Sequence, residues 1–168
     1  MDIKREVIKS QELLKRYAAG DRNFAGIRFR EMSLREVDLR EIDLSWSEFI
    51  GVDLSGTNLS HANLIGVKLL CVNLSKANLS HANLRWADLT GADCIGTNFS
   101  NANLSDAILT AVKFDGADLY RAAIGGDAIL IATDFRGAKN FPPIGQGTLV
   151  CKTFWDDGDF FKGPEWVE

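Results

Sequence analysis

The sequence predicts an all-β solenoid, a chain that winds repeatedly around one axis. The first observation is an apolar residue at every fifth position from Phe24 to Ile124: of twenty-one such positions, fourteen are Leu and five are Phe. A period of five suits neither an α-helix, around which these residues would spiral, nor a flat strand, on which they would alternate between faces. The second observation is a repeat of twenty residues, since segments 54–73 and 74–93 are identical at ten of twenty positions. The chain therefore turns steadily, and residues twenty apart stack on one another.

Each five-residue unit has a defined pattern around its Leu or Phe, which we call position i. Position i−2 is small or β-branched, as at Ala62 and Val67, and position i−1 is mostly Asn or Asp, as at Asn63. Positions i+1 and i+2 are variable, and most of them are polar or Gly. We expect i and i−2 to point into a common interior. Asn and Asp suit the bend between units, because their side chains bond to nearby backbone groups.

The consensus A(N/D)LXX, which covers roughly residues 22–140, resembles that of the pentapeptide-repeat family. The leader from Glu12 to Phe24 also resembles the start of cyanobacterial members. The resemblance implies a right-handed quadrilateral β-helix of pentapeptide repeats, with four units per coil. Residues 21–140 would then form about six coils.

The two ends of the chain depart from the repeat. Residues 3–19 have the apolar spacing of a helix, and Gly20 is a suitable helix stop. We expect residues 1–20 to be an N-terminal α-helical cap, because an open solenoid end exposes apolar surface and unpaired strand groups. Residues 141–168 begin with a Phe-Pro-Pro sequence and are rich in aromatic residues, which predicts a lid over the last coil or a docking segment.

One break in register interrupts the repeat near its end. After Ile124 the apolar position moves to Leu130, so one extra residue has entered near 125–127, where the sequence is Gly-Gly-Asp. Glycines are what a bulge or a short loop requires. A tolerated insertion is the simpler interpretation, and a functional loop is the alternative.

Charge and composition exclude several classes of partner. The net charge is −4, and Lys/Arg against Asp/Glu number ten to eight in residues 1–41, seven to ten in 42–140 and two to five in 141–168. A uniformly basic face is absent, which argues against direct nucleic-acid binding. The first twenty residues are too charged for a signal peptide, and no apolar run is long enough to span a membrane. We therefore expect a cytoplasmic protein without membrane contact.

No pattern of catalytic, metal-binding or cofactor-binding residues stands out. His61 and His81 lie one coil apart, but zinc usually takes three or four ligands and no third is implied nearby. Ser60 and Ser80 precede these histidines, yet adjacent side chains at a corner do not form a triad. The glycines follow no phosphate-binding spacing. We expect no enzyme activity, no cofactor and no metal, and the three cysteines form no disulfide framework.

The outward positions give better candidates for binding. Trp46 and Trp86 are forty residues apart, hence on one wall, and Arg85 adjoins Trp86. Exposed Trp and Arg are typical anchors of binding surfaces. The candidate protein-binding surface therefore comprises Trp46, Trp86, Arg85, His61 and His81. The alternative is that each ring lies flat on a neighbouring corner.

Two functions follow from these observations. The first is a non-catalytic structural or protein-interaction scaffold with an unidentified protein partner, acting as a monomer or as a dimer through an end of the solenoid. The second comes from the resemblance, because quinolone-resistance members of the family resemble duplex DNA and bind DNA gyrase as dimers. A mimic needs acidic side chains along a wall, but one such column here reads Asp38, Asn58, Asn78, Asn98 and Asp118. The scaffold is therefore favoured over the DNA mimic.

Overall fold

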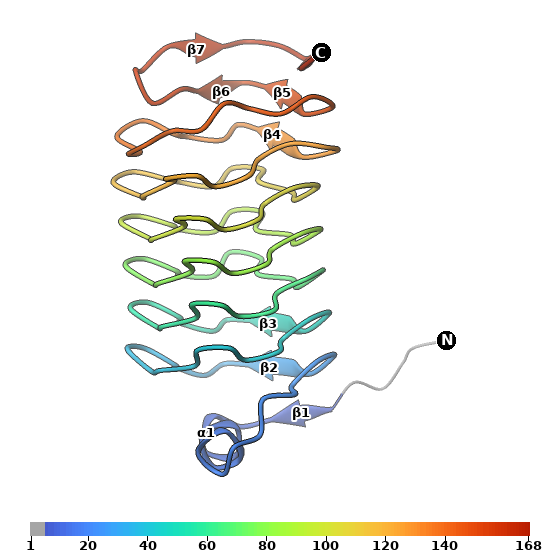
Figure 1. The fold of residues 1–168 in the computed structure, drawn as a ribbon, viewed down its shortest axis with the longest axis vertical. Helices are drawn as coiled ribbons and strands as arrows, with labels where there is room; N and C mark the ends of the chain where they lie inside the picture. Colours follow the sequence, from blue (N-terminus) through green and yellow to red (C-terminus); the bar gives the residue numbers. More distant parts are fainter. Residues whose placement is uncertain (1–5) are drawn as a thin grey trace.

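The computed structural model describes residues 6–168, which wind into a long stack of flat coils (Figure 1). Most of each coil lies in bends and single bridges, and the regular elements are short. They are β1 (Val7–Ile8), α1 (Ser10–Ala18), β2 (Arg28–Arg30), β3 (Glu48–Ile50), β4 (Ile129–Ile131), β5 (Leu149–Cys151), β6 (Thr153–Phe154), β7 (Phe160–Phe161) and β8 (Glu165–Trp166). Their sheet orders are β1-β2-β3, β4-β5-β8 and β6-β7.

Parallel pairing between residues twenty apart holds the coils together. β2 pairs with β3 in the register Arg28↔Glu48, and single bridges such as Asn58↔Asn78 continue the ladder on the other walls. The backbone N–H of Leu54, for example, donates to the carbonyl of Asn73 at 2.9 Å. The predicted solenoid with a twenty-residue coil is confirmed. The right-handed sense of winding stays a prediction.

The interior is filled as the repeat predicts. All twenty-one residues at position i, from Phe24 to Ile124, are at most 3% exposed. Most small residues at i−2 are buried beside them. Four of the threonines at i−2 donate their hydroxyl to a carbonyl of the preceding coil, as from Thr97 Oγ1 to Leu74 at 2.7 Å. A buried polar atom is thereby satisfied inside an apolar core.

Each corner of a coil is a tight turn with a left-handed residue at i+2. At Ala62, for example, the N–H donates to the carbonyl of Leu59 at 3.1 Å, and the intervening His61 has φ of +60°. The Asn or Asp at i−1 supports the turn by accepting the N–H of i+1, as Asn58 does from Ser60 at 3.1 Å. This geometry is that of a type II turn, which favours Gly at its third position. Many of these corners nevertheless carry larger side chains.

The N-terminal helix is shorter than the sequence predicts. Of the helix expected over residues 3–19, residues 3–5 lie outside the described part, and α1 occupies Ser10–Ala18. The correction concerns Val7 and Ile8, which form β1 and pair in parallel with β2. The exposed edge of the first coil offers these β-branched residues a strand partner, and that pairing overrides their helical spacing. Within residues 6–168, no helix is long and apolar enough to cross a membrane.

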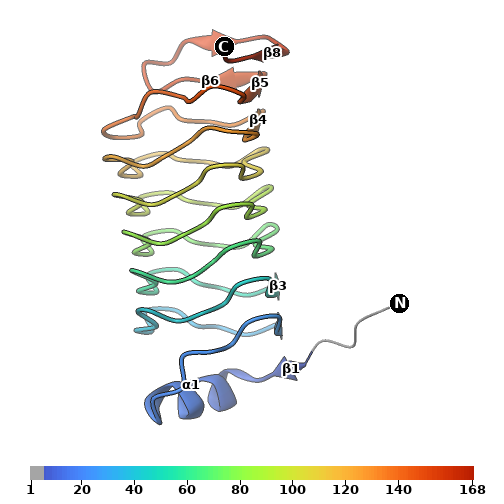
Figure 2. The same ribbon diagram turned by 45° about the vertical axis from the view of Figure 1, so that its right-hand side comes forward.

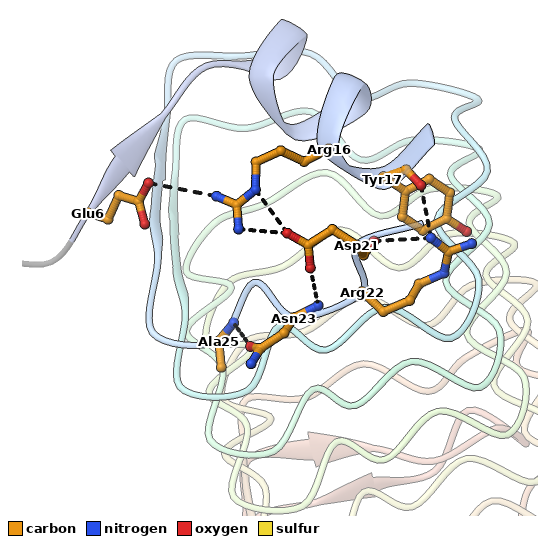
Figure 3. A network of polar contacts seen from close by, with 7 residues as sticks. All are labelled: Glu6, Arg16, Tyr17, Asp21, Arg22, Asn23 and Ala25. Atoms are coloured by element: carbon orange, nitrogen blue, oxygen red, sulfur yellow. Dashed lines mark hydrogen bonds and ion pairs between the residues drawn. The ribbon is translucent and has the colours of Figure 1, made fainter. Parts of the chain in front are cut away.

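α1 lies across the N-terminal end of the stack, with Leu13 buried (Figure 1). Gly20 follows the helix with φ of +96°, and the N–H of Asp21 donates to the carbonyl of Arg16 at 3.0 Å. Figure 3 shows how the Arg16 guanidinium then ties this end together, reaching Asp21 at 2.8 Å and Glu6 at 3.7 Å. The helix is thus connected to Glu6, which precedes β1, and to Asp21, which leads into the first coil.

The bridges also locate the extra residue near the C-terminal end. The partner spacing is twenty at Asn103↔Ala123 and twenty-one at Ile108↔Ile129. The additional residue therefore lies in the short segment 124–128, which includes the two adjacent glycines.

Winding continues beyond residue 140, which corrects the predicted boundary at 141. β5 pairs in parallel with β4, and Asp134 bridges to Phe154. Val150, Thr148 and Thr153 are buried on this last coil. The sequence conceals the coil because it lacks the Leu signature. β7 and β8 then fold back antiparallel on β6 and β5 and end the parallel ladder (Figure 2).

Candidate interaction surface

Four of the five candidate residues occupy the left-handed corner position. The φ angles of Trp46, His61, His81 and Trp86 lie between +59° and +60°. Such a backbone is unfavourable for bulky residues, costing about 1–2 kcal/mol relative to the right-handed region. A corner residue projects outward, however, so the strained backbone presents these rings on the surface.

Trp46 and Trp86 form a stacked pair on one corner, which we call the Trp corner. Their ring centroids are 6.4 Å apart with an interplanar angle of 27°. Gly66 lies between them in the stack, and a Cβ added there would overlap the Trp46 ring. The Trp46 ring therefore leans over a position that has no side chain. Both rings remain accessible to solvent, with Trp46 54% and Trp86 49% exposed.

Arg85 fixes the second ring of the pair. Its guanidinium carbon lies 4.3 Å from the Trp86 ring centroid, and its Nε donates to Asp106 Oδ2 at 2.6 Å. The hydrogen bond from Arg85, together with the backbone N–H of Asp127, lowers the pKa of Asp106 below its ordinary value. The carboxylate therefore stays charged at neutral pH and holds the guanidinium over the indole.

His61 and His81 stack on the neighbouring corner, which we call the His corner. Their ring centroids are 4.7 Å apart and nearly parallel, with an interplanar angle of 3°. The lone pairs of an imidazole lie in the ring plane, so two stacked rings direct their nitrogens side by side rather than toward a shared point. Within residues 6–168, no group of three or more His, Cys, Asp or Glu side chains could hold a metal ion.

The two corners border one side of the solenoid. Successive corners at His61 and Gly66, and again at His81 and Trp86, enclose segments 62–65 and 82–85. These segments stack through the bridge Asn63↔Asn83. We call this side the Trp–His wall. Sequence reasoning named the Trp pair and the His pair separately, and the structure brings them to opposite margins of a single wall.

One feature of this wall escaped the sequence analysis. A groove of about 610 Å³ lies at its C-terminal end, beside Tyr120, Arg121 and Phe141. The extra residue near 125 and the Pro-Pro sequence at 142–143 were the available signals, because both interrupt the regular wall. These two signals predict where the surface becomes irregular, but they do not predict that it forms a groove.

Comparisons with known proteins agree with the fold. Residues 42–122 match a family model described as a pentapeptide repeat region. No curated protein sequence matches the chain. The structure of trypsin-treated QnrB1, a plasmid-mediated fluoroquinolone resistance protein, is similar with a TM-score of 0.57. The two sequences are 20% identical, and the match covers 80% of this chain and 66% of the QnrB1 chain.

Two cyanobacterial structures are also similar. Rfr23 from Cyanothece 51142 is 22% identical over 87% of this chain and 99% of its own, with a TM-score of 0.41. HetL from Nostoc sp. strain PCC 7120 is described as involved in heterocyst differentiation regulation. It is 24% identical over 92% of this chain and 100% of its own, with a TM-score of 0.28.

Proposed function

Because the chain belongs to the pentapeptide-repeat family, we propose that it is a non-catalytic scaffold on which a partner protein docks at the Trp corner. The observation that carries this proposal is the pair Trp46 and Trp86, half exposed yet held in place by Gly66 and Arg85. Fixed aromatic side chains lose little conformational entropy on binding, which makes them effective anchors.

The chemistry of the described residues supports a non-catalytic role. The Cys94 thiol is fully buried, and this burial raises its pKa, so it is a poor nucleophile. His61 and His81 stack on each other, whereas a general base must reach a nucleophile within hydrogen-bonding distance. The recurring Asn and Asp at i−1 serve the turns of the coil, as the bond from Ser60 to Asn58 illustrates.

We also propose that the protein acts in the cytoplasm, as a monomer or as a dimer through one end of the solenoid. In this view α1 caps the first coil and the strands after residue 155 cover the last one. The burial of Leu13 and the antiparallel pairing of β8 with β5 support these roles.

The test of the docking proposal compares two pairs of exposed apolar residues. The double variant Trp46→Ala/Trp86→Ala removes the Trp corner, whereas Ile50→Ala/Leu70→Ala removes apolar side chains of similar exposure on another wall. Partners captured by the wild type from its own cells are identified and then produced pure for titration. We expect the Trp variant to lose binding and the control to keep it. Equal binding by both variants would exclude the Trp corner.

A DNA-mimicking inhibitor of a topoisomerase such as DNA gyrase is the alternative function. The similarity in fold to QnrB1 favours it, but the neutral column at Asn58, Asn78 and Asn98 weakens it, because neighbouring carboxylates are needed to imitate phosphates. A gyrase supercoiling assay separates the two functions. Inhibition at sub-micromolar protein would replace the scaffold proposal with the mimic.

A further inference from the structure

We propose that the groove beside Arg121 binds a short peptide segment of a partner protein, in which a bulky apolar side chain adjoins a carboxylate. This site goes beyond the proposed function, because it is distinct from the Trp corner and could be occupied without it. Its lining residues include Ser105, Tyr120, Arg121, Ala123, Phe141 and Pro143.

The shape and polarity of the groove suit a bulky apolar side chain. Its volume of about 610 Å³ is lined mainly by apolar or small side chains, and it is therefore large enough for a bulky aliphatic or aromatic group. Its base is nearly free of side chains, since Gly125 and Gly145 face each other across adjacent coils. A Cβ added at Gly125 would lie 3.0 Å from the Gly145 Cα.

Side-chain contacts and prolines hold the residues around the groove in place. Asn140 Nδ2 donates to Asp118 Oδ1 at 2.8 Å and anchors the start of the Phe141-Pro142-Pro143 segment. Each proline fixes its own φ and restricts the residue before it, so this segment has little conformational freedom. The Arg121 guanidinium lies 5.1 Å from the centroid of the Tyr120 ring, and both residues line the groove. A preformed groove binds with less loss of conformational entropy than one that must open.

The groove also carries an unmatched positive charge. Arg121 is the single charged residue that lines the groove, and no carboxylate within residues 6–168 forms an ion pair with it. The surface arginines Arg85 and Arg136, by contrast, each pair with an aspartate at 2.6 Å. An arginine prefers a carboxylate partner, and beside an apolar surface that pairing is less weakened by water. The groove therefore selects an acidic rather than a basic segment.

Titration of isotope-labelled protein with short peptides, followed by NMR, tests this assignment. The peptides are N-acetyl-Phe-Glu amide, its Gln and Lys counterparts, and N-acetyl-phenylalanine as a small free carboxylate. At millimolar concentration we expect the Glu peptide to shift the amide signals of the groove, the Gln peptide to bind about threefold more weakly, and the Lys peptide more weakly still. Shifts of equal size with the Lys peptide, or none with any peptide, would overturn the proposal.

Three variants identify the site. Arg121→Gln should reduce binding of the Glu peptide about threefold and leave the Gln peptide unchanged. Ala123→Leu should fill the groove and abolish both, since Ala123 is exposed and the added carbons enter no core. Lys76→Gln is the matched control, because Lys76 is also an exposed cation at a left-handed corner but lies elsewhere.

Two outcomes distinguish this groove from a small-carboxylate site and from the Trp corner. If N-acetyl-phenylalanine binds as tightly as the Glu peptide, the groove takes small carboxylates and the peptide proposal is wrong. If Trp46→Ala/Trp86→Ala abolishes the shifts, the peptide binds at the Trp corner, and the proposal of a separate site in the groove is wrong. Retention of the shifts in that variant supports the groove even where the proposed scaffold function fails.

Discussion

The Trp46 ring lies over the Cα of Gly66, in the space where a side chain would otherwise project. Trp86, one further coil along the same corner, stacks on that ring at 6.4 Å. The order Trp, Gly, Trp at intervals of twenty residues thus creates a notch and fills it with two indoles. The glycine matters twice, because its φ of +61° also suits the left-handed corner.

Replacing Gly66 by Ala should displace the Trp46 ring. We expect a loss of about 1–2 kcal/mol in unfolding free energy from the positive φ, and about 1 kcal/mol more from the disturbed ring pair. Urea titration measures the stability, and near-ultraviolet circular dichroism reports the ring contact. Gly96→Ala is the matched control, since Gly96 has φ of +66° and a Cβ there would meet only Lys76 Cγ at 3.7 Å. An unchanged spectrum in Gly66→Ala would show that the ring does not rest on Gly66.

The sequence was a good guide to the interior and a poor guide to the surface. Burial at position i follows from packing alone, so the burial of all the position-i residues between Phe24 and Ile124 could be predicted from the repeat. Twenty-residue stacking likewise predicted which rings share a corner. It could not predict that Trp46 would lean over Gly66, because that depends on a side-chain rotamer. The groove is lined by residues of two adjacent coils, among them Pro142 and Pro143 where the repeat pattern has ended, and no periodic pattern predicts it.

Two predictions from the sequence, about the start of the helix and the end of the solenoid, were wrong for the same physical reason. Val7 and Ile8 form a strand rather than a helix, and the coil around Val150 continues the solenoid without leucines. In both cases pairing with an adjacent coil decides the local structure. An exposed edge supplies hydrogen-bond partners to any suitable segment, whatever its own periodicity favours.

The buried hydroxyl of Thr97 should contribute to stability through one hydrogen bond. Thr97→Val keeps the β-branched shape but leaves the Leu74 carbonyl without the bond that Oγ1 donates at 2.7 Å. We expect a loss of about 1–2 kcal/mol, measured by urea denaturation. Thr90→Val is the control, because the Thr90 hydroxyl bonds to Asp88 on the outer surface, where water can replace it. Similar losses in both variants would contradict a stabilising role for the buried hydroxyl.

Cys71 and Cys94 should differ sharply in reactivity. Cys71 is exposed at a corner, whereas Cys94 is fully buried and its burial raises the pKa of the thiol. A thiol reagent at neutral pH should modify Cys71 in the folded protein and reach Cys94 only on unfolding. Mass spectrometry of timed samples measures the order, and Cys71→Ser should remove its rapid modification. Early labelling of Cys94 would mean that the coil opens under native conditions.

The contact between Arg16 and Asp21 should make the N-terminal end sensitive to acid (Figure 3). The hydrogen bond from Arg16, then that from the Asn23 backbone N–H, lowers the pKa of the Asp21 carboxyl below its ordinary value. A carboxyl whose pKa is lower in the folded state adds stability above its unfolded pKa, and the contribution is lost as the pH falls through the folded value. Asp21→Asn should therefore reduce the urea midpoint at neutral pH but not in strong acid. Asp156→Asn, which removes an exposed carboxylate, should match the wild type throughout. A constant difference between Asp21→Asn and the wild type at every pH would assign the effect to shape rather than to charge.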